Sequence, residues 1–230
     1  MKSWNKVTES RLSNIFRRLK RKRVELFVKE LSIKPSDIVL DLGSEDGSYL
    51  SEYFPYPENI VIADIAEEPM RRGVAKNGLR GYRRIPTSGP LPFKDCEFDA
   101  VWCNSVIEHV TIDKSDLATV TNQEFDHAAN EHQALFAQEI ERISKKYFVQ
   151  TPHIHFPIES HSWLPIIPYL THSQRWKLGV SLKAYWIKQW SADFHLYSRS
   201  RFEQHFAGAD SFYTERLVGI PKSLIAIRRE

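Results

Sequence analysis

Short apolar runs, each followed by polar or turn-forming residues, recur along the first half of the chain. The stretch 38–42 carries Asp41 near its end and leads into Gly43, and the stretch 60–65 carries Asp64 near its end. A further apolar run spans 100–103. Continuous apolar runs of this length are typical of buried parallel strands. The pattern therefore predicts an α/β fold with a mostly parallel sheet.

The second half of the chain continues the alternation. Helical spacing predicts a helix over 131–144 that turns four apolar side chains inward, and a strand follows at 147–150; the four are Leu135, Phe136, Ile140 and Ile143. The polar stretch 111–130 before that helix is longer than a usual connection, and we interpret it as a partly helical lid. A helix at 199–206 and strands at 212–217 and 223–228 complete the predicted elements.

An amphipathic helix is predicted at the N-terminus. Two apolar sets recur at i, i+3, i+4 and i+7; they are Leu12, Ile15, Phe16 and Leu19, then Val24, Phe27, Val28 and Leu31. Residues 1–34 hold 11 Lys or Arg against 3 Asp or Glu, a net charge of +8 within a total of +3. The basic stretch 11–23 is either the solvated face of a packing helix or a contact for an anionic membrane, a phosphate-bearing substrate or, less favoured, nucleic acid.

Length and composition fit one domain. The 230 residues, 42% of them hydrophobic, can bury a single core. We divide residues 1–230 into the N-terminal helix at 1–34, a core at 35–150, an insert at 151–198 and closing elements at 199–230. Cys96 and Cys103 are too few to form a disulfide framework, and we expect Cys103 to be a small buried apolar residue. With no apolar leader and no membrane span, a cytoplasmic location is expected, with peripheral contact at the inner membrane face as an option.

The turns after the first two strands carry candidate chemistry. Glycine at 43 lets the main chain turn sharply beside a ligand, and Asp64 can accept hydrogen bonds from two ribose hydroxyls. Since ligands of open α/β sheets bind beyond the carboxyl ends of the strands, these residues predict a nucleoside site. The loop GSEDGS lacks both the Gly-x-Gly-x-x-Gly fingerprint and a P-loop, which disfavours NAD and ATP.

Three segments in this order resemble a known family. The segments are IVLDLGSEDG at 38–47, the acid at the end of IVIADI at 60–65, and LPFKDCEFDAVWCNSVIEHV at 91–110. With them the chain resembles the class I S-adenosylmethionine-dependent methyltransferases. That resemblance implies a Rossmann-like sheet of seven strands whose last strand inserts antiparallel between strands five and six.

The same resemblance implies a set of cofactor residues. S-adenosyl-L-methionine would be held by Asp41, Gly43, Ser44, Gly47, Asp64, Ile65, Thr87 and Asn104, with Asn104 near the site of methyl transfer. Two positions depart from the family pattern. Glu45 stands where the loop has its central glycine, and Thr87 stands where an acid is often found. These departures motivate one alternative, a non-catalytic partner protein with a methyltransferase fold.

Candidate bases and acceptor contacts lie after the fourth strand and in the insert. His109 and His161 are the two candidates for a general base, and His153, Glu159 and Trp163 are candidate substrate contacts. Each has a structural alternative, since His109 can be a packing residue and the Glu159 and His161 pair can pin the loop. Glu108 and His109 alone provide too few ligands for Mg²⁺, so no metal is expected.

The segment TPHIHFPIESHSW resembles a subgroup of bacterial methyltransferases that act in saccharide and cell-surface glycan biosynthesis. Four tryptophans between 160 and 190 would either contact substrate or pack the core of the insert. We therefore expect methyl transfer to a hydroxyl of a small molecule or of a glycan- or lipid-linked saccharide. The alternative is an RNA methyltransferase, which is disfavoured because the chain reads NSVI after the fourth strand rather than an Asn-Pro-Pro-Tyr element.

Overall fold

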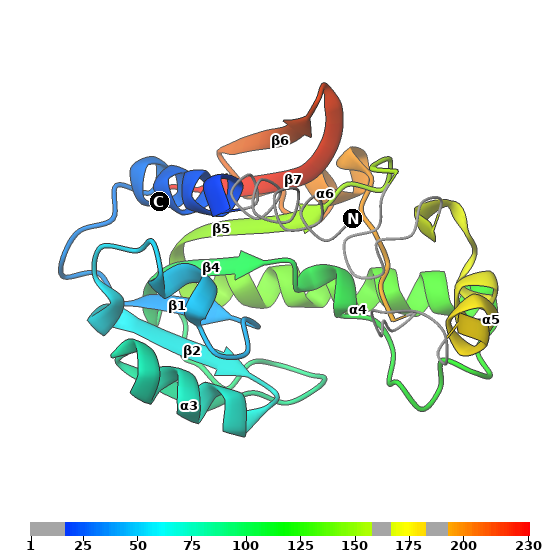
Figure 1. Cartoon of the computed structure of the whole chain (residues 1–230), viewed down its shortest axis with the longest axis horizontal. Coiled ribbons are helices and arrows are strands. Elements are labelled where there is room, and N and C mark those ends of the chain that lie inside the picture. The colour runs from blue at the N-terminus through cyan, green and yellow to red at the C-terminus, as the bar shows by residue number, and fades with distance from the viewer. Residues whose placement is uncertain (1–16, 158–166, 183–192) are drawn as a thin grey trace, which may run out of the picture.

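The computed structural model describes residues 17–157, 167–182 and 193–230, and these form one seven-stranded sheet flanked by helices (Figure 1). The strand order is β3-β2-β1-β4-β5-β7-β6. The strands are β1 (Val39–Leu42), β2 (Ile60–Asp64), β3 (Gly81–Arg84), β4 (Phe98–Asn104), β5 (Ser144–Pro152), β6 (Ser211–Leu217) and β7 (Ile220–Arg228).

The pairing confirms the predicted fold. Strands β1 to β5 run parallel to their neighbours, while β7 lies antiparallel between β5 and β6. The apolar runs of β1, β2 and β4 are buried as expected. The apolar pattern did not identify β3, because this edge strand is a short polar segment, GYRR, with no buried residue.

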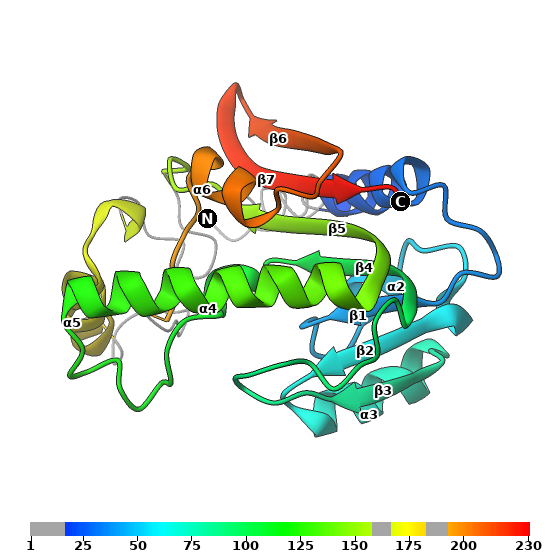
Figure 2. The same cartoon turned by 180° about the vertical axis from the view of Figure 1, so that it is seen from behind.

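One face of the sheet is covered by α4 (Asn122–Ile143) and α6 (Arg199–His205), which lie in front of the sheet in Figure 2. Ile140 and Phe202 from these helices share an apolar cluster with Leu40, Val101 and Val149 of the sheet. The other face is covered by the N-terminal helix, described over 17–30, with α2 (Ser48–Ser51) and α3 (Glu67–Asn77).

The N-terminal helix packs its predicted apolar stripe on the sheet. Val24, Phe27 and Leu31 are buried, and the Phe27 ring lies 5.1 Å from that of Trp102 between ring centroids. Trp102 in turn stacks on Phe148 with centroids 5.0 Å apart. The helix is therefore an integral layer of the core, and the prediction of an amphipathic packing helix is confirmed over its described part.

Helix α4 begins at residue 122, nine residues before the predicted start at 131. Its first turn is closed by a capping box, in which the Thr121 hydroxyl accepts from the Glu124 amide and the Glu124 carboxylate accepts from the Thr121 amide. The partly helical character predicted for 111–130 is therefore confirmed over 122–130, which forms the first turns of α4, and the role of this segment as a lid stays a prediction. Leu135, predicted to face inward, is 52% exposed, and Gln133 is buried instead.

The insert is described in part. It contains η3 (Ile167–Tyr169) and α5 (His172–Leu182), and α5 packs on the end of α4 that extends beyond the sheet (Figures 1 and 2). Trp176 packs on a small cluster of Leu117, Phe125 and Ala129, so this tryptophan has a packing role. Trp163, Trp186 and Trp190 lie outside the described residues.

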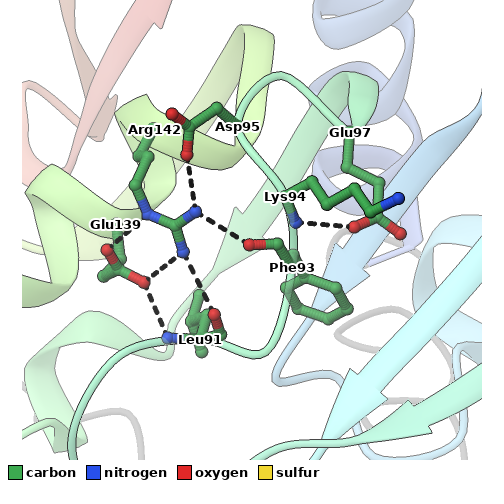
Figure 3. Close-up of polar contacts among 7 residues, drawn as sticks. All are labelled: Leu91, Phe93, Lys94, Asp95, Glu97, Glu139 and Arg142. Carbon is green, nitrogen blue, oxygen red and sulfur yellow. Dashed lines mark hydrogen bonds and ion pairs between the residues drawn. The ribbon is translucent and has the colours of Figure 1, made fainter.

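Arg142 anchors the loop before β4 to the end of α4 (Figure 3). Its guanidinium donates to the carbonyl oxygens of Leu91 and Phe93 at 3.0 and 2.8 Å, and to the carboxylates of Asp95 and Glu139 at 2.9 and 2.7 Å. Glu139 also accepts from the Leu91 amide at 2.6 Å. The LPFKDCEF segment is therefore held by one helix turn and leads the chain into β4.

Two further expectations can be compared with the described residues. Cys103 is buried in β4, Cys96 is exposed, and both are free thiols. Across 17–157, 167–182 and 193–230, no helix has the length and apolar character needed to cross a bilayer.

Candidate active site

Most of the predicted cofactor residues lie at the carboxyl ends of β1, β2 and β4, along one edge of the sheet. The chain leaves β1 toward β2 on one side, while β4 pairs with β1 on the other. This reversal is the topological switch point, where open α/β sheets bind their ligands. The sequence therefore placed Asp41, Gly43, Asp64 and Asn104 on the correct edge.

Asp41 is a fully buried carboxylate without a partner. Among the described residues neither of its oxygens has a hydrogen-bond partner of normal geometry; the nearby Ser44 hydroxyl lowers the Asp41 pKa, but burial outweighs this effect. Burial raises the pKa of Asp41 to about 7. A buried polar atom left unpaired costs roughly 1–3 kcal/mol, so such a group is expected where a ligand completes the site.

The loop after β1 is tight at two positions. Gly43 has a φ of +79°, its amide donates to the Ala63 carbonyl at 2.7 Å, and a Cβ there would lie 2.5 Å from Val106 Cγ1. Glu45, the departure from the family pattern, takes a φ of +58° and is exposed. A glutamate in this left-handed region is strained, which explains why glycine suits the position. The loop after β1 nevertheless keeps its tight turn with a glutamate at this position.

Gly47 contributes to packing. It caps α2 with a φ of +68°, and a Cβ there would meet Leu79 and Ile62 side-chain atoms at 2.8 and 2.9 Å. The following helix is a single turn, and the Ser48 amide already donates to the Asp46 carboxylate at 3.0 Å. This helix is therefore too short to direct several free backbone amides at a ligand.

Asp64 ends β2 and holds the loop. Its carboxylate oxygens accept from the amides of Glu45 and Ala66 at 3.0 and 3.1 Å. Each carboxylate oxygen has two lone pairs, so these bonds leave room for ribose hydroxyls. Ile65 next to it is 47% exposed, which offers an apolar surface at the site edge. Thr87 is exposed in the loop after β3.

Asn104, at the end of β4, is oriented by a buried arginine of the N-terminal helix. Arg23 Nη1 donates to Asn104 Oδ1 at 2.7 Å and to Gln150 Oε1 at 3.2 Å. The other side of the guanidinium pairs with the Glu215 carboxylate, with Nε and Oε1 3.0 Å apart. Because Oδ1 of Asn104 accepts from Arg23, the amide nitrogen is the group left to donate to a ligand.

His109 ends η2 (Ile107–His109) and faces an aspartate that the sequence did not identify. Its Nδ1 lies 3.2 Å from Asp193 Oδ1, and Lys114 Nζ lies 3.4 Å from Asp193 Oδ2. Burial would raise the pKa of Asp193, but the hydrogen bond and charge of His109 and the charge of Lys114 lower it to about 2. The His109 side chain is 31% exposed. The pair is thus an ionised carboxylate beside an accessible imidazole.

The backbone holds this pair in place. The Thr111 hydroxyl donates to the Asp193 carbonyl at 2.8 Å, and the His195 amide donates to the Glu108 carbonyl at 2.7 Å. Gln133 of α4 donates to the carbonyls of both Ile107 and His195. The segment that returns from the insert is therefore tied to η2, where His109 lies.

The predicted substrate residues are placed only in part. His153, just after β5, is buried, and its Nδ1 accepts from the His155 amide at 3.0 Å. The rings of His153 and His155 lie 5.3 Å apart between their centroids. Glu159, His161 and Trp163 fall outside the described residues.

The site residues that the sequence patterns did not identify differ in how clearly the sequence marks them. Arg23 lies four residues after Leu19 and four before Phe27, so the apolar spacing itself marks it as facing inward. Gly73 of α3 also has a signal, since a glycine inside a helix points to close packing. Asp193 has none, because it lies 84 residues from His109 along the chain.

The described residues provide little that could bind a metal ion. Glu108 is buried and accepts from the Thr151 hydroxyl at 3.0 Å. In the part of the chain that the structure covers, no three His, Cys, Asp or Glu side chains are grouped so that they could hold a metal ion.

The fold, the switch point and the unpaired carboxylate together define a nucleoside-binding α/β protein. Residues 40–146 match the sequence profile of a family described as "Methyltransferase domain". Residues 40–146 are therefore a methyltransferase domain; the protein is an enzyme, and its cofactor is S-adenosylmethionine. A search of curated proteins found no match.

Solved structures share the fold at low identity. The PH0226 protein from Pyrococcus horikoshii OT3 is 15% identical with a TM-score of 0.52, covering 90% of this chain and 89% of that one. The YcgJ protein from Bacillus subtilis is 14% identical with a TM-score of 0.51, covering 91% and 99%. The N-terminal domain of EvdMO1 with SAH bound is 15% identical with a TM-score of 0.50, covering 90% and 79%.

The residues present fit this cofactor. S-adenosylmethionine carries a sulfonium and an ammonium. The buried, unpaired carboxylate of Asp41 provides the negative charge that such a cationic group requires. The close approach of the Gly43 backbone to Val106 leaves no space for a side chain at that turn.

Proposed function

We propose that this enzyme transfers a methyl group to a hydroxyl of a small molecule, or of a glycan- or lipid-linked saccharide. The observation that carries the proposal is the His109 and Asp193 pair near the carboxyl end of β4. A hydroxyl must lose its proton as it is methylated, so a positioned base favours oxygen as the accepting atom.

The protonation states follow from the pair. Asp193 is ionised and can only accept, so Nδ1–H of His109 donates to it whether the ring is neutral or charged, and Nε2 is the nitrogen that would take up the proton. The carboxylate fixes the tautomer and the ring orientation, and it stabilises the imidazolium that forms after proton transfer. His109 is therefore the proposed base and Asp193 its positioning residue.

The other polar residues at this edge of the sheet would bind and orient the cofactor. When bound, S-adenosylmethionine supplies a methyl group activated by its sulfonium. Asp41 provides the negative charge for a cationic group, Asp64 the acceptors for hydroxyls, and the amide nitrogen of Asn104 a donor. Alignment of the reacting atoms and exclusion of water supply much of the rate enhancement in a displacement of this kind.

The saccharide class of acceptor rests on the insert. The segment TPHIHFPIESHSW resembles that of saccharide methyltransferases, and its first two residues are the end of β5, at the edge of the sheet where the site lies. The RNA alternative is weakened by Arg23. Arg23 belongs to the basic stretch that would contact phosphates, but its side chain is buried against Glu215. The other basic side chains of 17–22 are exposed, so contact with an anionic membrane stays a proposal.

The test compares variants with a panel of hydroxyl acceptors. We expect His109→Asn to lower kcat by about 100-fold or more, and Asp193→Asn to lower it less, while calorimetric binding of S-adenosylmethionine is unchanged. His127→Asn, an exposed histidine of α4, is the matched control and should retain full activity. Full activity of His109→Asn would remove the base from the proposal, and methylation confined to RNA would replace the acceptor class.

A further inference from the structure

A small cavity opens beside Asn104, beyond the carboxyl ends of β4 and β5. Its volume is about 90 Å³, enough for a few water molecules or one small polar group. Its wall includes Arg23, Ser105, Gln150, His153, Lys222 and Ser223. These side chains come from the N-terminal helix, the end of the β4–β5 pair and β7, so four distant parts of the sequence build one wall.

The charges of the wall do not cancel. Arg23 is matched by Glu215, to which it donates through Nε and Nη2. Lys222 is half-buried and, within the described residues, its ammonium makes no hydrogen bond or ion pair. Burial lowers the pKa of Lys222, which is the sign of a charge held away from water without a full partner. The wall therefore carries about one net positive charge.

The neutral groups of the wall also present donors. His153 Nδ1 accepts from the His155 amide, and burial lowers the pKa of His153, so the ring is neutral with its proton on Nε2. Gln150 Oε1 already accepts from Arg23 and from the Ser105 hydroxyl, at 3.2 and 2.9 Å, so its amide nitrogen is the end left to donate. A cationic group and two donors on one small cavity match the oxygens of an anion.

We propose that this cavity binds an anionic group, a carboxylate or a phosphate, of the molecule that is methylated. The inference rests on the proposed function, because it places the acceptor beside Asn104. Lys222 supplies the charge, and His153 and Gln150 supply the donors. The acceptor would thus be an acidic or phosphorylated hydroxyl compound rather than a neutral one.

The test uses inorganic phosphate and acetate as probes at constant ionic strength, with S-adenosylhomocysteine bound to the full chain. We expect one of the two to bind with a millimolar or tighter Kd, and Lys222→Met to weaken that binding by about tenfold or more. Lys222→Arg, which keeps the charge, should retain it. Lys76→Met, an exposed lysine of α3 far from the cavity, is the matched control and should bind as the parent does.

The outcomes are separable. Phosphate binding alone points to a phosphorylated acceptor, and acetate binding alone to a carboxylic acid. No binding of either probe, or equal binding by Lys222→Met, overturns the inference, as does probe binding that occurs only in the absence of S-adenosylhomocysteine, which would assign the cavity to the cofactor's own carboxylate. If Lys222→Met does not fold, Lys222→Gln gives the same comparison. The proposed function fails separately, if S-adenosylmethionine shows no binding heat while the probe still binds.

Discussion

At the scale of single residues, the site depends on carboxylates with opposite environments. Asp41 is buried without a partner of normal hydrogen-bond geometry, and its pKa is raised to about 7; Asp193 is buried beside His109 and Lys114, and its pKa is lowered to about 2. Both lie at the edge of the sheet that binds the ligand. Asp41 gains an oppositely charged partner only when a cationic ligand binds, whereas Asp193 already has its partners in the folded protein.

The environment of Asp41 predicts a pH dependence. Its folded-state pKa lies above the unfolded value of about 3.9, so the folded state retains a proton that the unfolded state loses between about pH 4 and pH 7. Stability without ligand should fall across that window, by an amount on the order of 4 kcal/mol, and level off above it. Chemical denaturation at several pH values measures this, and Asp41→Asn should flatten the profile.

The same group predicts the direction of cofactor affinity. A cation in the site favours ionised Asp41, so binding below pH 7 should release a proton, and affinity should rise with pH until about 7. Calorimetry in buffers with different ionisation enthalpies counts the proton. Proton release that persists in Asp41→Asn would assign the linkage to another group.

At the scale of elements, the approach of α3 to the loop after β1 depends on one glycine. A Cβ at Gly73 would lie 2.0 Å from the Asp46 carbonyl oxygen, a backbone atom that cannot move without displacing the loop. We expect Gly73→Ala to lower the free energy of unfolding by about 1–3 kcal/mol and to weaken cofactor binding. The matched control is Gly81→Ala in β3, where nothing lies within 4 Å of the added carbon. Equal stability of the two variants would contradict the close contact.

The loop before β4 gives a second prediction at this scale. Arg142→Met removes the bonds to Leu91, Phe93 and Asp95 and leaves the Glu139 carboxylate without its cation (Figure 3). We expect a loss of about 2–3 kcal/mol in the free energy of unfolding and faster hydrogen exchange of the amides at 91–97. Arg72→Met, whose exposed guanidinium lies 3.7 Å from Glu68, should change neither.

What the sequence predicted follows from where each signal lies. The strands β1, β2 and β4 are buried on both faces, so their continuous apolar runs predicted them from the sequence. The glycines and acids at the ends of these runs could then be predicted as site residues. The edge strand β3 and the first turns of α4 carry polar residues, and only the TNQE capping box marks the start of α4. Asp193 and Lys222 reach the site through tertiary packing, and the pattern of residues along a single sequence carries no sign of it.

At the scale of the whole molecule, the N-terminal helix is linked to the active site through Arg23. This one side chain joins the helix to β4, β5 and β6 through Asn104, Gln150 and Glu215. The helix therefore stabilises the fold and also sets the orientation of a site residue.

The loss of this link is predicted to be large and partly reversible. Arg23→Met leaves Glu215 half-buried without its cation, which should lower the free energy of unfolding by roughly 3 kcal/mol. Adding Glu215→Gln should restore part of that loss, because the unpaired charge is removed. Arg21→Met, an exposed arginine on the same helix that pairs with Glu25, should lower it by less than about 1 kcal/mol. Additive losses in the double variant would argue against the pairing.

Strand β7 lies between β5 and β6 although it follows both in the sequence (Figure 1). During translation, the outer edge of β5 therefore has no neighbour until residues 220–228 have left the ribosome. An open edge on an apolar strand recruits other chains, so the nascent protein should depend on chaperone protection through most of its synthesis. Ribosome-bound chains stalled before residue 220 should accordingly aggregate on release, whereas those that include β7 should fold.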